Sequence, residues 1–414
     1  MNALYTLSIQ LYSLLIRLVA PFNLKARQIS AGRKRTFPEL SKKITHDKPI
    51  AWVHCASLGE FEQGRPVIEA IRKNYPNYRI LLTFFSPSGY EIRKNYELAD
   101  YICYLPADTK SNARKFIELV NPEIVFFVKY EFWHYYINEL KRKNIPLYLI
   151  SAIFREQQQF FRHTPWGKWY RQMLFGFAHF FVQDDQSVQL LKQIGITNVT
   201  RAGDTRFDRV AEIARSGKQI PLVEKFKGDK LLVVAGSTWK PDEEILARFI
   251  HSHPETKFVI APHETKRVNI DRLINLLKTK TTCYTSATDD SVMNSQVLIV
   301  DTIGVLSSIY RYADLSYIGG GFGVGIHNTL EAAIFGMPIV FGPNYLKFNE
   351  ATSMVKLGIA HPVSDADSLE SILQELLSNN DKRSKIAFEC NKFTDQNLGA
   401  TQTILNKVFN KPAF

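Results

Sequence analysis

Two carboxylates in the first half of the chain each come shortly after an apolar run. Glu60 follows residues 50–56, and Glu131 follows residues 123–128. Both runs have the composition of buried strands, so we expect each carboxylate near the carboxyl end of a strand. A carboxylate in that place can act as a general base, and a pair suits acid–base work on a sugar hydroxyl. A carboxylate in the first turn of a helix would explain Glu60 equally well, and a solvated loop carboxylate would explain Glu131.

A cation, Arg206, stands in the segment GDTRFD at residues 203–208, where the first half of the chain ends. A guanidinium group can neutralise the charge that develops on a departing phosphate. The alternative is a salt bridge at a hinge between the two halves.

The most unusual segment is the glycine-rich run GGGFGVGIHNTLE at residues 319–331. It follows a strand pattern that ends at Ile318 and precedes a helical pattern that starts near Asn328. Glycines let the backbone approach a ligand closely, and the free N–H groups of a helix N-terminus can bind phosphate. Glu331, in the first helical turn, could accept hydrogen bonds from ribose hydroxyls. The spacing differs from the dinucleotide pattern G-x-G-x-x-G, and the alternative is a tight turn whose Glu complements the helix dipole.

Two further short motifs follow strand patterns in the second half. The first is AGSTW at residues 235–239, which contains Ser237 and Thr238 and could contact a phosphate or cap a helix. The second is APHE at residues 261–264, which contains Pro262 and His263. This histidine could contact a base or a phosphate, or could be structural.

These motifs sit in a chain that alternates strand and helix patterns. Other strand patterns lie at residues 79–84, 101–105, 146–151, 180–183, 231–235, 257–261, 297–300, 315–318 and 338–341. Such alternation predicts an α/β fold with two doubly wound, Rossmann-like domains, whose ligands bind at the carboxyl ends of the strands and in the cleft between the domains. We expect an N-terminal domain at residues 36–207, a linker at 208–230 and a C-terminal domain at 231–414, whose last helix is a candidate to cross back.

The first 35 residues form a separate segment. Residues 2–22 are mostly apolar and are interrupted by Gln10 and Arg17. A basic cluster follows, with Lys25, Arg27, Arg33, Lys34 and Arg35. The order of charge and apolar residues is the reverse of a secretory signal peptide. We expect a membrane-associating helix, which either crosses the bilayer once or lies in the interface on anionic headgroups; the alternative is an apolar helix docked on the protein's own core.

Composition excludes some classes of protein. Apolar residues make up 45% and charged residues 22% of the 414-residue chain, which is far from the composition of a disordered chain. Only one apolar segment approaches spanning length, so a polytopic membrane protein is excluded. The net charge of +12 suggests an acidic partner, but basic stripes with interleaved aromatics are missing, so we expect no nucleic acid. The four cysteines are far apart, which favours a reducing compartment, and no spacing of a metal site occurs.

Taken together, the motifs resemble those of the 3-deoxy-D-manno-octulosonic acid (Kdo) transferases, glycosyltransferases of the GT-B class. The resemblance runs from the apolar N-terminus to Tyr345. It rests on the joint order of His54-x-x-Ser57-x-Gly59-Glu60, Glu131-x-Trp133, Gly203-x-x-x-Phe207-Asp208, Ala235-Gly236-Ser237-Thr238-Trp239, and the run from Gly319 to Glu331 continued by Phe341-Gly342-Pro343.

The resemblance implies roles for individual residues. Glu60 matches the family's general base, and Glu131 matches a second carboxylate that assists the transition state. Arg206 stands where many members carry Lys, which keeps the charge but changes the hydrogen-bond geometry. The residues expected to bind CMP-Kdo are Ser237, Thr238, Pro262, His263, Gly304, Val305, Leu306, Gly320, Gly321, His327, Asn328, Thr329, Leu330 and Glu331. Among these, Val305 and Thr329 stand where many members have an acidic residue and a proline.

The resemblance also implies an activity. We expect an inverting transferase that moves Kdo from CMP-Kdo to a lipid A precursor, lipid IVA, at the cytoplasmic face of the inner membrane, without a metal or other cofactor. One alternative is a GT-B enzyme that uses a UDP-sugar on a lipid-linked or cell-wall precursor. A non-enzymatic alternative is a membrane-docked protein that binds an acidic polymer, which would require clustered basic residues.

Overall fold

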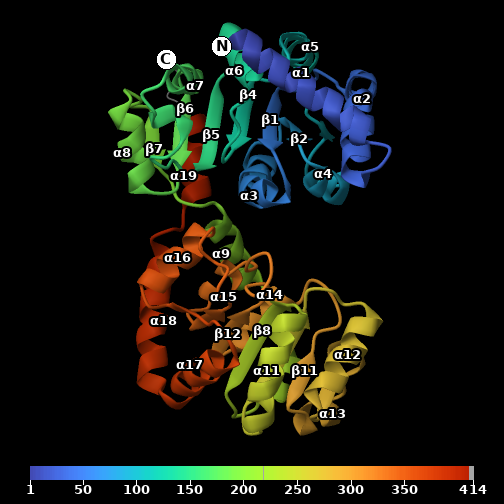
Figure 1. The fold of residues 1–414 in the computed structure, drawn as a ribbon, viewed down its shortest axis with the longest axis vertical. Coiled ribbons are helices and arrows are strands. Elements are labelled where there is room, and N and C mark those ends of the chain that lie inside the picture. The colour runs from blue at the N-terminus through green and yellow to red at the C-terminus, as the bar shows by residue number, and fades with distance from the viewer. Residues whose placement is uncertain (218, 410–414) are drawn as a thin grey trace. The chain divides into compact units, whose positions relative to one another are not determined.

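The computed structural model describes residues 1–217 and 219–409. By its internal contacts the chain divides into two compact units, which are shown in Figure 1. Unit 1 contains Met1–Asp208 and the C-terminal segment from Asn397, and unit 2 is Arg209–Gln396. The stretch 208–230, for which a linker was predicted, holds most of helix α9 (Arg206–Ser216) and helix α10 (Pro221–Lys227).

Unit 1 is built on one parallel sheet of seven strands, in the order β3-β2-β1-β4-β5-β6-β7. The strands are β1 (Ile50–Cys55), β2 (Arg79–Phe84), β3 (Tyr101–Tyr104), β4 (Ile124–Val128), β5 (Leu147–Ala152), β6 (His179–Val182) and β7 (Val199–Arg201). The strand order reverses between β1 and β4, which pair directly. In sheets of this kind ligands bind at the carboxyl ends of the strands where the order reverses.

Helices cover both faces of this sheet (Figure 1). They are α3 (Leu58–Asn74), α4 (Pro87–Arg93), α5 (Lys110–Val120), α6 (His134–Arg142), α7 (Pro165–Leu174), α8 (Asp185–Gln193) and α19 (Ala400–Phe409), with a 3-10 turn at Gln159–Phe161. Because side chains alternate along a strand, β1 serves two cores: Trp52 packs on one face with Phe116 and Phe127, and Val53 packs on the other with Phe126. The last helix, α19, belongs to this second core of unit 1.

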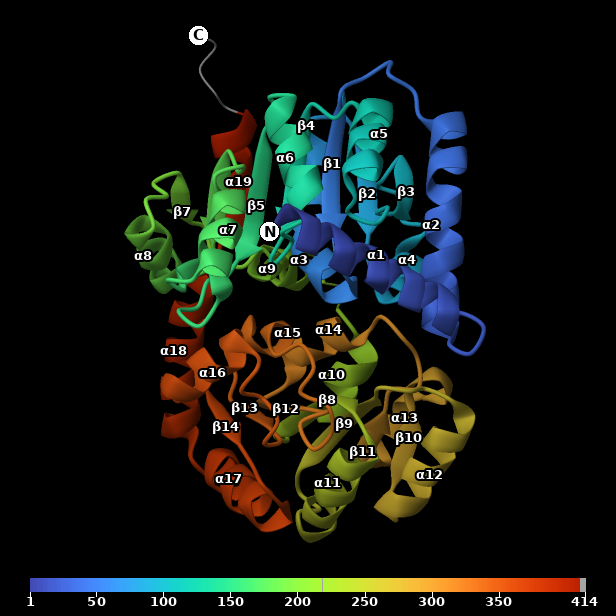
Figure 2. The same ribbon diagram turned by 45° about the horizontal axis from the view of Figure 1, so that its top comes forward.

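Two N-terminal helices complete unit 1. Helix α2 (Leu24–Lys43) packs beside β3, and helix α1 (Asn2–Val19) lies across the carboxyl ends of the strands, as Figure 2 shows. Polar and aromatic side chains hold α1 in place: the Tyr5 hydroxyl donates to Asp108 at 2.5 Å, and Asn2 accepts from the Trp169 indole at 2.7 Å.

Unit 2 has a second parallel sheet of seven strands, in the order β10-β11-β9-β8-β12-β13-β14. The strands are β8 (Leu232–Thr238), β9 (Lys257–Pro262), β10 (Thr281–Cys283), β11 (Val297–Ile299), β12 (Leu315–Ile318), β13 (Ile339–Phe341) and β14 (Ala360–Pro362). The order reverses between β8 and β12, so the segments that follow these two strands lie side by side.

The helices of unit 2 are α11 (Lys240–Ser252), α12 (Arg267–Leu277), α13 (Asp289–Asn294), α14 (Leu306–Ile309), α15 (Leu330–Ala333), α16 (Asn349–Lys356), α17 (Ala366–Ser378) and α18 (Asn380–Asp395). Two 3-10 turns lie at Tyr284–Ser286 and Tyr310–Tyr312. The fold therefore confirms the predicted class, two doubly wound α/β sheets.

Candidate functional site

Glu60 lies just beyond the carboxyl end of β1. All six residues of β1 are buried, and helix α3 follows with Ser57 as its N-cap residue. Glu60 is partly exposed in the first turn of α3, and the Ser57 hydroxyl donates a hydrogen bond to its carboxylate. Its partial exposure leaves the Glu60 side chain open to solvent or a ligand.

Glu131 follows the neighbouring strand β4 and is held in a buried network. The His54 side chain is fully buried, and its Nε2 lies 3.0 Å from a carboxylate oxygen of Glu131. The Trp133 indole donates to the same oxygen at 2.6 Å. On its other side, His54 Nδ1 lies 2.8 Å from the Thr83 hydroxyl. Glu131 therefore has two donors that fix its carboxylate, and it is no freely solvated loop residue.

The hydrogen bonds of this network indicate the tautomer of His54. The Thr83 oxygen accepts from the Trp52 indole at 2.8 Å, so its own proton is available to His54 Nδ1. His54 Nε2 then carries the proton and donates it toward Glu131. A polar residue within an apolar strand must find such partners, and this rule is the signal that could have identified His54 from the sequence.

Both carboxylates lie close to the same buried thiol. Burial raises the pKa of the Cys55 thiol, and the negative charges of Glu60 and Glu131 raise it further. The structure thus brings the two predicted carboxylates together at the ends of adjacent strands.

Arg206 begins helix α9 and forms an ion pair within unit 1. Its guanidinium donates to the carboxylate of buried Asp204, with Nη2 at 2.6 Å, and Gln63 donates to the same carboxylate at 3.1 Å. Burial alone would raise the pKa of Asp204, but the charge and hydrogen bonds of Arg206 hold it below its ordinary value. The salt bridge left open by the sequence is therefore present, and a role toward a phosphate stays a prediction.

The glycine-rich turn of unit 2 depends on the absence of side chains. A Cβ on Gly319 would stand 2.3 Å from the Ser237 carbonyl oxygen, so only glycine allows the β8 and β12 ends to approach so closely. Gly320 has a φ of +90°, in the left-handed region. Its N–H donates to the buried carboxylate of Asp242 at 2.9 Å. Asp242 also accepts from the Tyr317 hydroxyl at 2.8 Å, and it anchors the turn to helix α11.

The segments 304–307 and 328–331 meet at Glu331. The Ser307 hydroxyl donates to one carboxylate oxygen at 2.7 Å and the Asn328 amide to the other at 3.0 Å. Helix α15 begins at Leu330, two residues later than predicted, with Thr329 as its N-cap residue. Glu331 lies in its first turn, as expected. The predicted Gly304–Leu306 segment leads into α14, and Ser307, which the sequence did not single out, links the two segments.

Three aromatic rings stack at the ends of β8 and β9. His263 lies 4.6 Å from Trp239 and 4.5 Å from His327 between ring centroids, and the Trp239 indole donates to His327 Nε2 at 3.0 Å. Burial, and after it the charge of His263, lowers the pKa of His327 to about 4. His327 is therefore neutral at pH 7 and accepts through Nε2. A cavity of about 240 Å³ beside this stack is lined by Thr238, Pro262 and Arg272 among others.

The predicted donor residues therefore come together in unit 2. The residues at the ends of the adjacent strands β8, β9 and β12, or in the segments that follow them, are Ser237, Thr238, Pro262, His263, Gly320, Gly321, His327 and Asn328 to Glu331, and Gly304 to Leu306 join them through Ser307. Stacked rings of this kind suit a nucleotide base.

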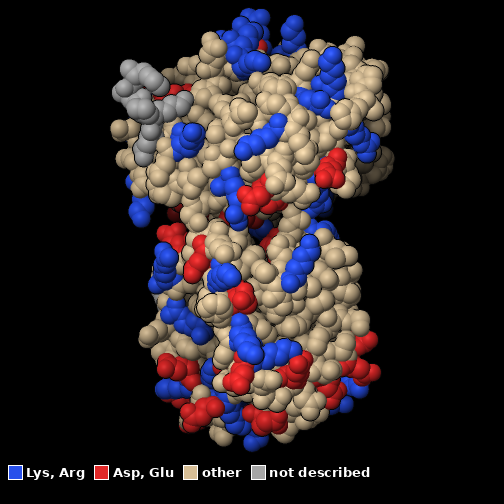
Figure 3. Space-filling view, turned by 90° about the vertical axis from the view of Figure 1, so that its left-hand side faces the viewer, with Lys and Arg blue, Asp and Glu red and all other residues tan. Residues whose placement is uncertain are grey.

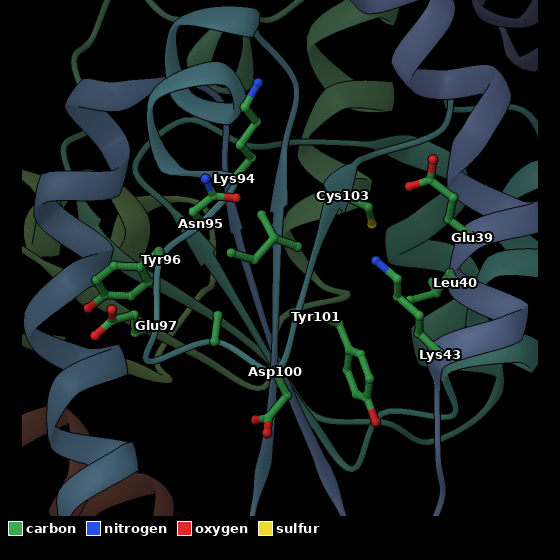
Figure 4. A pocket seen from close by; sticks show the side chains of 12 residues that line it. Glu39, Leu40, Lys43, Lys94, Asn95, Tyr96, Glu97, Asp100, Tyr101 and Cys103 are labelled. Carbon is green, nitrogen blue, oxygen red and sulfur yellow. The ribbon is translucent and has the colours of Figure 1, made fainter.

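A separate cavity of about 300 Å³ lies beside β3, at the edge of the unit 1 sheet (Figure 4). It is lined by charges of both signs, including Glu39, Lys43 and Lys94, and by none of the predicted site residues. In the described residues 1–217 and 219–409, no group of three or more His, Cys, Asp or Glu side chains is placed to hold a metal ion.

Comparison with known proteins finds similar sequences over most of the chain. Residues 30–209 match the family model of 3-deoxy-D-manno-octulosonic-acid transferase (kdotransferase). Relatives of that name include proteins from Rickettsia typhi (27% identical over 87% of this chain and 79% of the relative) and Aquifex aeolicus (28% identical over 83% and 90%). Another, from Haemophilus influenzae, is 25% identical over 86% of this chain and 85% of the relative.

Solved structures agree with the fold. UDP-GlcNAc 2-epimerase from Neisseria meningitidis has a TM-score of 0.59 at 16% identity and covers 88% of this chain and 100% of its own. MurG from Acinetobacter baumannii has a TM-score of 0.56 at 12% identity, with coverages of 88% and 100%. With its two parallel sheets and these relatives, the chain is similar to 3-deoxy-D-manno-octulosonic acid (Kdo) transferases over most of its length, and its fold is of the GT-B class.

Proposed function

We propose that the protein transfers Kdo from CMP-Kdo to a lipid A precursor, lipid IVA, and inverts the anomeric centre. The observation that carries this proposal is the pair Glu60 and Glu131 at the ends of adjacent strands, inside the segment that matches the Kdo transferase model. The nucleotide of the donor is held by the stacked rings and the glycine-rich turn of unit 2, and unit 1 supplies the base.

In the reaction, the Glu60 carboxylate takes the proton from an acceptor hydroxyl. That oxygen forms a bond to the anomeric carbon of Kdo from the face opposite CMP, while the bond from that carbon to the CMP phosphate oxygen breaks. CMP leaves with the electron pair. Arg206 and helix N-termini stabilise the charge on the departing phosphate, and Glu131 assists the oxocarbenium-like transition state.

The enzyme acts at the cytoplasmic face of the inner membrane. None of the residues of α1 is buried, and its exposed apolar side chains are Leu4, Leu7, Leu11, Leu14, Leu15, Leu18 and Val19. An apolar helix docked on the protein's own core would bury these side chains, so their exposure argues against that alternative. The first 45 residues carry eight Lys or Arg and one acidic residue, so seven of the twelve net positive charges lie there. On the face drawn in Figure 3 the charged side chains over unit 1 are mainly Lys and Arg.

The helix lies in the interface between lipid and water rather than across the bilayer. No single helix among the described residues is long and apolar enough to cross a membrane. Helices α1 and α2 are long and apolar enough only when they are taken together, and the chain bends by 118° at the break between them. An apolar face with a basic flank suits an anionic leaflet.

The test is a transfer assay. The purified protein receives CMP-Kdo, made in situ, and tetraacylated lipid IVA, and products are read by mass. Wild type is expected to add at least one Kdo unit, and folded Glu60→Gln to lose most turnover. CMP release with transfer of Kdo to a different lipid would change the acceptor. Thermal protection by UDP and not CMP, with no CMP release, would favour the UDP-sugar alternative and refute the proposal.

A further inference from the structure

Arg33 on helix α2 points into unit 1, away from the exposed basic cluster in which the sequence placed it. Its Nε donates to the Leu105 carbonyl at 3.2 Å, and its guanidinium carbon lies 4.6 Å over the Phe85 ring. Burial lowers the pKa of this guanidinium. A charged group removed from water normally has an ion-pair or hydrogen-bond partner for each donor.

One end of this guanidinium has no protein partner among the described residues. Nη2 of Arg33 is buried and meets no acceptor within the described part of the chain, and no ion pair to Arg33 occurs there. The nearby carboxylate of Asp108 is already occupied, because it accepts from the Tyr5 hydroxyl and from the backbone N–H groups of Tyr135 and Tyr136. Arg33 therefore keeps a donor and a positive charge available for an anion.

The cavity beside Arg33 has the lining of an anion site. It measures about 230 Å³, and we call it the basic cavity. Its polar lining consists of Arg17 from α1, Arg33 and Lys34 from α2, and the uncharged side chains of Ser13, Ser30 and Asn112. It has three cations and no carboxylate among its lining residues. Phosphate oxygens are the ligands that such a set of guanidinium, ammonium and hydroxyl donors binds best.

Arg33 also lines a second, apolar cavity of about 220 Å³, which Trp133 lines as well. Tyr12 of α1 stacks on Phe85 at 6.0 Å, and Phe85 stacks on Trp133 at 4.9 Å between ring centroids. Trp133 donates to Glu131. Phe85, Leu105 and Trp133 follow β2, β3 and β4, so Arg33 lies at the same edge of the sheet as the two carboxylates.

We propose that the basic cavity binds a phosphate group of the acceptor lipid, with Arg33 as the residue that anchors it. The ligand class is a phosphorylated, acylated sugar, and the inference rests on the proposed function. Bulk phospholipid headgroups carry the same phosphate chemistry. They are the poorer match for Arg33, because exposed cations outside the basic cavity, such as Lys25 and Arg35, are available to a membrane surface, whereas Arg33 is turned toward the strand ends.

The test compares three probes on the full-length protein. The first is the bisphosphorylated, tetraacylated glucosamine disaccharide in detergent micelles, the second is the same lipid after phosphatase treatment, and the third is a vesicle of phosphatidylglycerol and phosphatidylethanolamine. Dissociation constants are measured without a donor sugar, for wild type, Arg33→Gln and the control Arg114→Gln. Arg114 is an exposed arginine of α5 in a surface pair with Glu118, so its replacement removes the same charge elsewhere.

Arg33→Gln is expected to weaken binding of the phosphorylated lipid at least tenfold, since charge-assisted hydrogen bonds are lost, and to leave the dephosphorylated lipid and the vesicles within twofold of wild type. Arg114→Gln should match wild type in all three. If Arg33→Gln does not fold, Arg17→Gln is the second variant, because the Arg17 side chain is exposed and its replacement should not affect folding. It should weaken binding of the phosphorylated lipid by about threefold and leave binding of the other two probes unchanged.

Equal effects on the phosphorylated and dephosphorylated lipids would overturn the proposal. So would an equal loss on vesicles, which would assign Arg33 to bulk headgroups. Unchanged binding in Arg33→Gln would overturn it as well. Because these measurements need no transfer, phosphate-dependent binding without any Kdo transfer would refute the proposed function and keep the site. Kdo transfer that does not depend on Arg33 or on the phosphate would refute the site and keep the proposed function.

Discussion

Replacing His54 tests whether the buried network sets the position of Glu131. His54→Leu removes two hydrogen bonds, one to the Glu131 carboxylate at 3.0 Å and one to the Thr83 hydroxyl at 2.8 Å. A bond to a charged group contributes about 1.5–3 kcal/mol and a neutral one about 0.5–1.5 kcal/mol, so we expect a loss of about 2–4 kcal/mol in the free energy of unfolding. For a unit of this size that corresponds to a fall in Tm of about 4–16 °C.

The effect on catalysis is expected through position and not through contact with substrate. Trp133 still donates to Glu131 in the variant, so the carboxylate keeps one donor and gains rotational freedom. A misplaced catalytic group costs up to about 100-fold, and we expect kcat for Kdo transfer to fall about 10- to 100-fold with the KM for CMP-Kdo nearly unchanged. His54→Gln, which can return a donor to the carboxylate, should recover part of kcat.

Thr83→Val is the matched control. It removes two hydrogen bonds of the Thr83 hydroxyl, one with His54 Nδ1 and one from the Trp52 indole, and leaves the bond from His54 Nε2 to Glu131 in place. Its Tm should fall by a similar amount while kcat stays within about threefold of wild type. The assay measures kcat, KM and Tm for each variant at a temperature below all the transitions. If folded His54→Leu keeps kcat within twofold, or Thr83→Val loses as much kcat as His54→Leu, the positioning argument is wrong.

Three further outcomes are expected. Gly319→Ala should lower Tm and weaken CMP binding, because its Cβ would stand 2.3 Å from a backbone oxygen; such overpacking costs about 1–3 kcal/mol, and unchanged calorimetry would contradict it. Burial raises the pKa of Asp108 to about 6, so this group binds its proton more tightly when folded and stability falls by about 2 kcal/mol from pH 4 to pH 7. Asp108→Asn should flatten that part of the curve in pH-dependent denaturation. Leu11→Ser should reduce sedimentation with anionic vesicles about tenfold, whereas Val268→Ser, an exposed control on α12, should not.

The class of fold was predictable from alternating strand and helix patterns, because buried parallel strands such as β1 and β4 are continuous apolar runs. The edge strands β7, β10 and β14 were missed. Each has three residues, and of these nine residues only Ala360 is fully buried. Such a pattern is too short and too weakly apolar to be distinguished from a loop.

Residues at strand ends were found for a general reason: parallel strands bring their carboxyl ends to one edge of the sheet. That rule predicts Glu60, Glu131 and the glycine-rich turn. It does not predict residues that come to the same edge of the sheet from a helix. Arg33 illustrates the difference. The buried positions of α2 include Ile29, Thr36 and Leu40, and a spacing of four, three and four places Arg33 on the same stripe. Periodicity could therefore have shown that Arg33 faces inward, where local charge clustering suggested a surface.

The two units support their candidate ligand groups by the same physical means. In unit 1 the Glu131 carboxylate is fixed by His54 and Trp133, and in unit 2 buried Asp242 fixes the Gly320 N–H. In unit 1 the two donors occupy one carboxylate oxygen of Glu131 and leave the other for a ligand, whereas in unit 2 the Gly320 N–H is used by Asp242 and this bond fixes the shape of the turn. Such groups are oriented before the ligand arrives, so its binding energy is not consumed in ordering them. Substitutions of the buried partners should then change rates and affinities although these residues do not contact the substrate. A His54 variant therefore tests the positioning of Glu131 more directly than a variant of Glu131 itself.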